Sequence, residues 1–191
     1  YRFSISWSRV LPNGHGLVNE EGVGFYNKLI DELIANGIRP VATLYHWDLP
    51  LTLQIEHDGW LSESTASAFV QYASFCFHRF GDRVKHWITF NEAWTFIVLG
   101  YGTGSKAPGV PYTNISTYPY LAGHNVLLAH AEAVEAFRVN SKVRAHGGRI
   151  GITNNCDWNE PASASPADVA AAERANEWWL AWFADPIWLG H

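Results

Sequence analysis

The sequence predicts an α/β protein in which parallel strands alternate with helices. Apolar, strand-like runs begin near residues 2, 39, 87 and 150, and helix-sized amphipathic segments lie between them. Strands that alternate with helices form parallel sheets with right-handed crossovers. No linker, repeat or low-complexity tract interrupts the pattern, so residues 1–191 are expected to form a single domain.

The spacing of the strands favours a (β/α)8 TIM barrel, of which this chain supplies about four consecutive βα units. Successive strand starts are 37, 48 and 63 residues apart, and the excess length lies mainly in loops that follow strands. In such barrels those loops build the active site. The alternative, an open doubly wound sheet, needs a G-x-G-x-x-G turn after an early strand. The sequence contains no such turn.

The first half of the chain shows two strands and one helix. Arg2 to Trp7 alternates polar and apolar residues, as a strand does. Ile38 to Tyr45 is a second apolar strand, with Pro40 near its start. Between them a helix is expected to end at Gly37. Its apolar stripe comprises Phe25, Leu29 and Leu33, with Tyr26, Ile30 and Ile34 beside them.

The second half repeats the alternation. Strands are expected over 86–90 and 149–153, and a long loop over about 100–119. Ser165-Pro166-Ala167-Asp168 predicts the start of a last helix, which is expected to run to Ala184. Two further helices are indicated by apolar stripes. The first stripe comprises Phe69, Tyr72, Ala73, Cys76 and Phe80, and that helix is expected to end at Gly81. The second stripe comprises Val126, Leu127, His130, Ala131, Val134 and Phe137.

Composition excludes several classes of function. The net charge of −5 and the absence of a Lys/Arg cluster argue against a nucleic-acid partner. No apolar run approaches the roughly 18 residues of a membrane span. Neither a His-x-x-x-His nor a Cys-x-x-Cys arrangement is present, so no metal and no cofactor is expected. Oligomeric state and localisation remain open.

Other compositional features give weaker expectations. The two cysteines, Cys76 and Cys156, are expected to be buried thiols rather than a disulfide. The sequon Asn114-Ile115-Ser116 matters only in a secreted protein. The chain has no Met, so we expect it to be an internal piece of a longer polypeptide. Its ten Trp residues hint at carbohydrate, because flat aromatic rings stack on the C–H faces of sugars.

Thr89-Phe90-Asn91-Glu92 places a carboxyl and a carboxamide side by side at the end of an apolar strand. At such a position a Glu can protonate a leaving group while Asn bonds a substrate hydroxyl. The alternative is a helix-capping Asn followed by a solvated Glu. Because successive strand residues point to opposite faces, the strand must end or bulge at Asn91 for both side chains to reach one cavity.

Several motifs together resemble the β-glucosidases of glycoside hydrolase family 1. They occur in the family's order, span nearly the whole chain and correspond to roughly strands 2–5 of the barrel. The matching segments are YRFSISWSR (Tyr1–Arg9), LYHWDLP (Leu44–Pro50), FGDRVKHW (Phe80–Trp87), TFNE (Thr89–Glu92), APG (Ala107–Gly109), HNVLLAHA (His124–Ala131) and WFADP (Trp182–Pro186).

The resemblance implies hydrolysis of β-glucosides or cello-oligosaccharides with retention, using two carboxyl groups about 5–5.5 Å apart. Glu92 matches the family's acid/base and Asn91 the residue that bonds the sugar 2-hydroxyl. His46 matches a contact to the sugar hydroxyls, and Trp47 a wall of the same subsite. The alternative for His46 is a core histidine with satisfied hydrogen bonds.

Two further residues are implied less firmly. Arg2 matches a barrel-floor arginine that would bond the nucleophile and keep it ionised. Its alternative is a structural ion pair. Asn155 is either a contact on the aglycone side or a cap or turn residue.

The chain also departs from the family. Ala93 stands where Pro usually follows the acid/base, and no Glu-Asn-Gly motif for the nucleophile occurs. Residues 1–191 alone are therefore expected to be inactive and, with unpaired strand edges, prone to aggregate. The rival interpretations are a catalytically silent, glycosidase-like sugar-binding protein and a 6-phospho-β-glycosidase. Glu92 argues against a thioglucosidase, which would carry Gln there.

Overall fold

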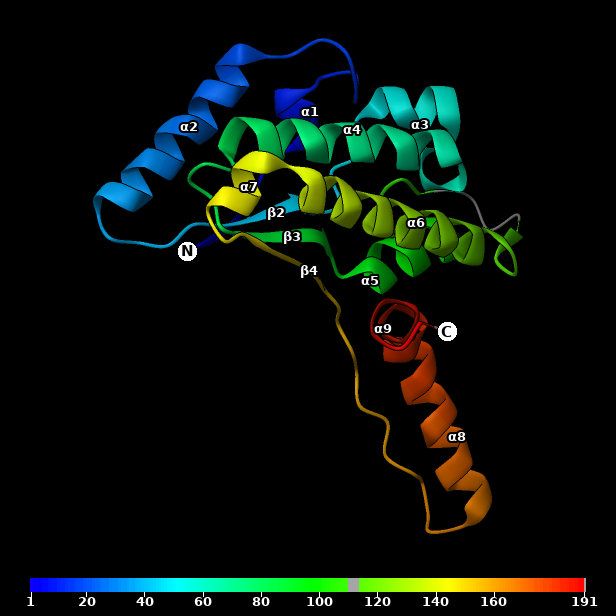
Figure 1. Ribbon diagram of the computed structural model, residues 1–191. Coiled ribbons are helices and arrows are strands. Elements are labelled where there is room, and N and C mark those ends of the chain that lie inside the picture. The colour runs from blue at the N-terminus through cyan, green and yellow to red at the C-terminus, as the bar shows by residue number, and fades with distance from the viewer. Residues whose placement is uncertain (110–113, 191) are drawn as a thin grey trace.

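The computed structural model describes residues 1–109 and 114–190. Its strands form one parallel sheet in which each strand pairs with the next along the chain, as consecutive units of a barrel do (Figure 1). The strands are β1 (Arg2–Ser4), β2 (Val41–Tyr45), β3 (His86–Asn91) and β4 (Arg149–Thr153).

Helices cover one face of this sheet. In Figure 1, α2, α4 and α6 lie along that face, and the chain after β4 runs away from it to α8 before α9 returns toward α5. None of the described helices is long and apolar enough to cross a membrane. The helices are α1 (Trp7–Val10), α2 (Glu20–Ala35), α3 (Leu51–His57), α4 (Glu63–Phe80), α5 (Ala93–Ile97), α6 (Tyr118–Val139), α7 (Ser141–Ala145), α8 (Pro166–Asn176) and α9 (Trp182–Trp188).

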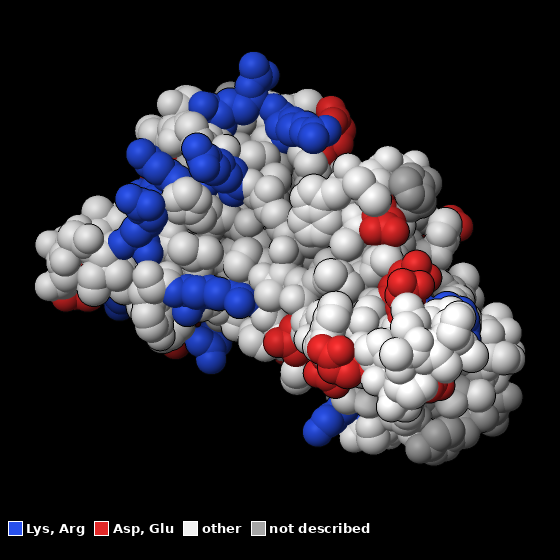
Figure 2. All heavy atoms as spheres, turned by 90° about the horizontal axis from the view of Figure 1, so that it is seen from below, with Lys and Arg blue, Asp and Glu red and all other residues white. Residues whose placement is uncertain are grey.

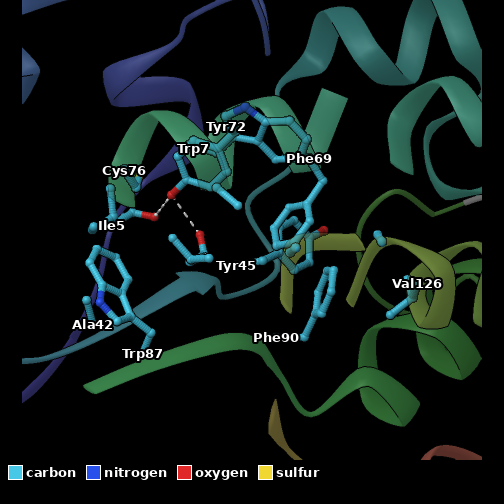
Figure 3. Packing of buried hydrophobic residues seen from close by; sticks show 14 of the residues in the cluster. Ile5, Trp7, Ala42, Tyr45, Phe69, Tyr72, Cys76, Trp87, Phe90 and Val126 are labelled. Atoms are coloured by element: carbon cyan, nitrogen blue, oxygen red, sulfur yellow. Dashed lines mark hydrogen bonds between the residues drawn. The ribbon is translucent and has the colours of Figure 1, made fainter. Parts of the chain in front are cut away.

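The core lies between the sheet and the helices and is largely aromatic (Figure 3). The Tyr72 hydroxyl on α4 is within hydrogen-bond distance of the main-chain oxygens of Ile5 (3.0 Å) and Leu44 (2.8 Å). On the same helix, the Phe69 ring stacks on Phe90 of β3 with centroids 4.4 Å apart. Through these contacts α4 packs against the ends of β1, β2 and β3.

The first two strands are shorter than predicted. The first ends at Ser4, because Trp7 leaves the strand pattern and begins α1. The Trp7 ring stacks on Tyr72 at 5.0 Å, and its indole nitrogen donates to the Gly14 oxygen at 2.9 Å. The second strand begins at Val41 rather than Ile38, since Pro40 has no N–H to contribute to the sheet.

The predicted buried stripe of the first long helix is partly wrong. Phe25 and Ile34 are 51% and 44% exposed. The predicted residues Tyr26, Ile30 and Leu33 are buried, and Val23 joins them, so the buried face of α2 is centred on Tyr26 and Ile30 rather than on Phe25 and Leu29. Phe25 instead lies beneath the Arg9 guanidinium, 4.8 Å from the ring centroid. The predicted end is confirmed: the helix stops at Ala35, and Gly37 adopts a φ of +70°.

The C-terminal helix begins as predicted but ends later. The Ser165 hydroxyl accepts a hydrogen bond from the Asp168 amide at 3.2 Å, with Pro166 in the first turn. A π-helical turn, Glu177–Ala181, then joins α8 to α9, which continues past Ala184 to Trp188. Pro186 lies inside α9, where it has no N–H to donate to the preceding turn.

The prediction of two buried thiols is correct for Cys76 and wrong for Cys156, which is exposed; both are free. Cys156 follows β4, where the chain leaves the packed body (Figure 1). On the face shown in Figure 2, Lys and Arg lie mostly over one half of the molecule, and Asp and Glu over the other half.

Candidate active site

Arg2 links three strands on the face of the sheet opposite the helices. Its Nε donates to the Thr43 hydroxyl on β2 at 3.0 Å, and its Nη2 donates to the Asn91 side-chain oxygen at the end of β3. Both acceptors are neutral, and within the described residues Arg2 makes no ion pair. The side chains of Arg2 and Asn91, which the sequence singled out separately, are thus brought together.

Strand β3 carries a bulge immediately before Asn91. Ile88 pairs with Gly151 and Asn91 pairs with Thr153, so β3 has one residue more than β4 in this interval. The extra residue lets two successive side chains contact the helices: Thr89 bonds α6, and Phe90 stacks on α4. A regular strand alternates its side chains, so only the bulge explains this arrangement. The predicted irregularity at Asn91 is confirmed.

Glu92 turns the chain out of the sheet. Its φ of +51° lies in the left-handed region, which few residues other than glycine adopt. The Glu92 amide still donates to the Thr153 oxygen at 2.7 Å, while its half-buried carboxylate lies 3.4 Å from the Thr95 hydroxyl of α5. The carboxylate is therefore held just beyond the end of the strand rather than within the ladder.

Trp47 connects the loop after β2 to the same point. Its indole nitrogen donates to the main-chain oxygen of Asn91 at 2.8 Å, and its φ is +76°. His46 is exposed and packs edge-to-face against Trp47 with ring centroids 5.3 Å apart. His46 is consequently not a core histidine in this structure, and the pair lies next to Asn91.

Asn155 stands apart from this group. It follows β4 by two residues, and within the described residues its half-buried side chain makes no hydrogen bond to Arg2, Trp47 or Asn91. Within the described residues, the Asn155 side-chain oxygen and the Asn91 side-chain nitrogen are both buried without a hydrogen-bond partner. The Asn91 nitrogen is thus a donor available to a ligand or to another part of the protein.

Sequence reasoning missed three residues that support the group. Thr43 accepts from Arg2, Thr95 reaches Glu92, and His130 bonds Thr89. Thr95 lies three residues after Glu92 in the first turn of α5, so the sequence spacing alone could have indicated that the two side chains are neighbours. His130 was assigned only to an apolar helix stripe, and its contact with Thr89 depends on how α6 packs.

A cavity of about 340 Å³ lies beside Trp47. Its walls come from the loop after β2, from α3 and from the turn after α5; they include Asp48, Gln54, Phe96 and Tyr101. Burial raises the pKa of the Asp48 carboxyl, and a hydrogen bond from Ser6 partly opposes that rise. The cavity is mostly apolar but has acidic and amide groups at its wall.

The group combines one carboxyl with neutral hydrogen-bonding side chains and a guanidinium. Such a set can bind hydroxyl groups and transfer a proton. Within 1–109 and 114–190, no three His, Cys, Asp or Glu side chains lie close enough together to hold a metal ion.

Comparison with known proteins gives a consistent result. A family model described as glycosyl hydrolase family 1 matches residues 1–191. β-Glucosidase 25 of Oryza sativa subsp. japonica is 50% identical over 200 residues, which cover 100% of this chain and 40% of that protein. The chain thus spans less than half the length of such relatives.

Solved structures agree on the fold. The rice β-glucosidase Os3BGlu6 matches with a TM-score of 0.95 at 47% identity, covering 100% of this chain and 41% of that one. The family 1 β-glucosidase of Thermotoga maritima matches with a TM-score of 0.92 at 43% identity, with the same coverage. The predicted fold class is confirmed: the sheet and its helices form part of a (β/α)8 barrel.

Proposed function

Because the chain belongs to glycosyl hydrolase family 1, we propose that the longer protein containing it is a retaining β-glucosidase. Its substrates are small β-glucosides or cello-oligosaccharides. The observation that carries this proposal is the junction at the end of β3. There, the bulge and the left-handed Glu92 set a carboxyl beside an Asn91 held by Arg2 and Trp47.

In the first step, the Glu92 carboxyl gives its proton to the glycosidic oxygen. The bond from the anomeric carbon to that oxygen breaks, and its electron pair stays on the departing oxygen. A carboxylate from a segment outside residues 1–191 attacks the anomeric carbon and forms a covalent glycosyl-enzyme. In the second step, the Glu92 carboxylate takes a proton from water as the water oxygen attacks the anomeric carbon. The bond from that carbon to the attacking carboxylate breaks, its electron pair stays on the carboxylate, and the sugar is released.

The neighbouring residues bind the sugar. The Asn91 side-chain nitrogen, which is buried without a partner in the described residues, donates to the 2-hydroxyl. His46 bonds another sugar hydroxyl, and Trp47 forms a wall beside it. Arg2 holds Asn91 and supports the attacking carboxylate. Asn155 is proposed only as a contact to the aglycone, because it is not joined to the others.

Descriptions of related structures support a sugar substrate. One structure of rice Os3BGlu6 is a mutant in a covalent complex with Glc, and one structure of the Thermotoga maritima enzyme is a complex with glucoimidazole. A covalent sugar complex accords with the retaining, two-step mechanism.

The direct test compares Glu92→Gln with the unmodified full-length protein on cellobiose and on a nitrophenyl β-glucoside. Loss of general acid catalysis is expected to reduce kcat/KM on cellobiose by roughly 10²–10⁴-fold. Glu135→Gln, an exposed carboxyl on α6, is the matched control and should have no effect. Unchanged hydrolysis of cellobiose by Glu92→Gln would refute the assignment.

Two further measurements separate the rival functions. NMR of the first product should show the β-anomer of glucose, since retention requires it. The isolated chain 1–191 should release no sugar, because it lacks the second carboxylate. Full-length protein that binds glucosides but never cleaves them would indicate a silent sugar-binding protein. Cleavage of only 6-phosphorylated glucosides would indicate the sister activity.

A further inference from the structure

Thr89 and His130 form a buried contact behind the strand that ends at Glu92. The Thr89 hydroxyl lies 2.8 Å from Nδ1 of His130 on α6 and donates to the main-chain oxygen of Gly151 on β4 at 3.2 Å. Thr89 is fully buried, and His130 is 6% exposed. One hydroxyl therefore joins β3, β4 and α6 at a single point.

The direction of these hydrogen bonds follows from the groups involved. A hydroxyl has one proton, and the Gly151 oxygen can only accept. Thr89 therefore donates to Gly151 and accepts from His130, whose proton must lie on Nδ1. Burial lowers the pKa of His130 to about 4, so the imidazole is neutral at physiological pH and carries a single ring proton.

The contact coincides with the bulge. The interval with the extra residue runs from Ile88 to Asn91 on β3 and from Gly151 to Thr153 on β4. Thr89 lies inside it and is bonded to Gly151, the last partner before the register changes. A bulge disrupts the local ladder, so the extra residue needs another anchor. The hydroxyl and the imidazole provide that anchor from outside the sheet.

We propose that His130 is a positioning residue. Through the Thr89 hydroxyl it holds the bulge of β3 and thereby directs the side chains of Asn91 and Glu92. His130 itself touches no substrate, and its role rests on the proposed hydrolase function. If the anchor is lost, β3 can relax toward a regular register, which would rotate Asn91 and Glu92 away from their common side.

Two matched pairs of full-length variants test this role. His130→Asn can place an amide N–H near the position of Nδ1, whereas His130→Leu has no donor. Thr89→Ser keeps the hydroxyl, whereas Thr89→Val removes it with little change in shape. The measurements are kcat/KM on cellobiose and on dinitrophenyl β-glucoside, the preference for glucosides over 2-deoxyglucosides, and the Tm.

Misdirection of Glu92 has a signature that mere destabilisation lacks. A dinitrophenolate leaves without a proton, whereas the alkoxide from cellobiose needs one. In His130→Leu and Thr89→Val, kcat/KM on cellobiose should fall roughly 10- to 100-fold, because a misplacement of about 1 Å in a catalytic group can cost that much. Their loss in the formation of the glycosyl-enzyme from dinitrophenyl glucoside, measured in the pre-steady state, should be clearly smaller, because only the contact of Asn91 with the 2-hydroxyl is then affected. Discrimination against 2-deoxyglucosides should also weaken, and His130→Asn and Thr89→Ser should recover most of the loss.

Equal losses on both substrates, or a lowered Tm with unchanged kinetics, would overturn the role of His130. If His130→Leu does not fold, the Thr89→Val and Thr89→Ser pair decides the same question. These outcomes differ from failure of the proposed function, in which the unmodified protein would be inactive or Glu92→Gln would remain fully active on cellobiose.

Discussion

The indole nitrogen of Trp47 donates a hydrogen bond of 2.8 Å to the main-chain oxygen of Asn91. This bond joins the loop after β2 to the end of β3, across residues 44 positions apart in the chain. Trp47 makes it from a left-handed backbone conformation with φ of +76°. Such a conformation costs about 1–3 kcal/mol in a residue other than glycine, so the surrounding contacts must hold it in place.

Replacing Trp47 with Phe keeps a ring and removes this donor. In the full-length protein we expect kcat/KM on a nitrophenyl β-glucoside to fall about fivefold, because one neutral hydrogen bond is worth about 1 kcal/mol. Trp158→Phe is the control, since its side chain is 73% exposed and its indole donates to the exposed Glu160 rather than to Asn91. Equal losses in the two variants would argue against a special role for the Trp47 bond.

Arg2→Lys should be far from conservative. Lysine cannot reproduce the planar set of donors that bonds Thr43 and Asn91 together. Hydrogen bonds to charged groups are worth about 1.5–3 kcal/mol, so a loss of about 10- to 100-fold in kcat/KM is expected. The same exchange at Arg149, exposed at the start of β4, should change little. Activity of Arg2→Lys within twofold of the unmodified protein would contradict this expectation.

Tyr72→Phe tests the packing that positions the strands. The change removes a hydroxyl that contacts two buried carbonyls, those of Ile5 and Leu44 (Figure 3). We expect urea unfolding to show a loss of about 1–3 kcal/mol, because buried acceptors are left without a donor. The control is Tyr120→Phe, whose side chain is 53% exposed, and it should lose less than about 0.5 kcal/mol.

The buried imidazole of His130 should make the folded protein less stable in acid. Burial lowers its pKa in the folded state from 6.5 to about 4, so the unfolded state binds more protons between these values. The contribution of neutral His130 is complete above the unfolded pKa and declines as the pH falls toward 4. The total loss is about 3 kcal/mol. A groove between α6, β4 and α9 is lined by His130 and by two other titratable residues of α6, His124 and Arg138, which are the same in both proteins compared.

The measurement is the free energy of unfolding of the unmodified protein and of His130→Asn at several pH values from 7 to 4. The difference in the free energy of unfolding between the two proteins should change by about 3 kcal/mol over this range, because the variant lacks the titrating imidazole. Parallel curves for both proteins over this range would show that His130 is not the group responsible.

Local patterns in the sequence sufficed for the elements that depend on near neighbours. Gly37 ends α2 with a positive φ, and Ser165 caps α8, because both effects act within a few residues. The order of the strands followed from their alternation with helices. The burial of Phe25, Ile34 and Cys156 was misjudged, since it depends on which surface the rest of the chain covers.

The sequence by itself determined that Asn91 and Glu92 end a buried strand and that β3 must break its alternation there. Only the tertiary structure decided how this happens: Thr89 bonds α6, Phe90 stacks on α4, and Arg2 reaches Asn91 from β1. The reason is the separation along the chain. Thr89 and His130 are 41 positions apart and Arg2 and Asn91 are 89 positions apart, so their hydrogen bonds form only when packing brings the elements together. Short-range periodicity records none of these contacts.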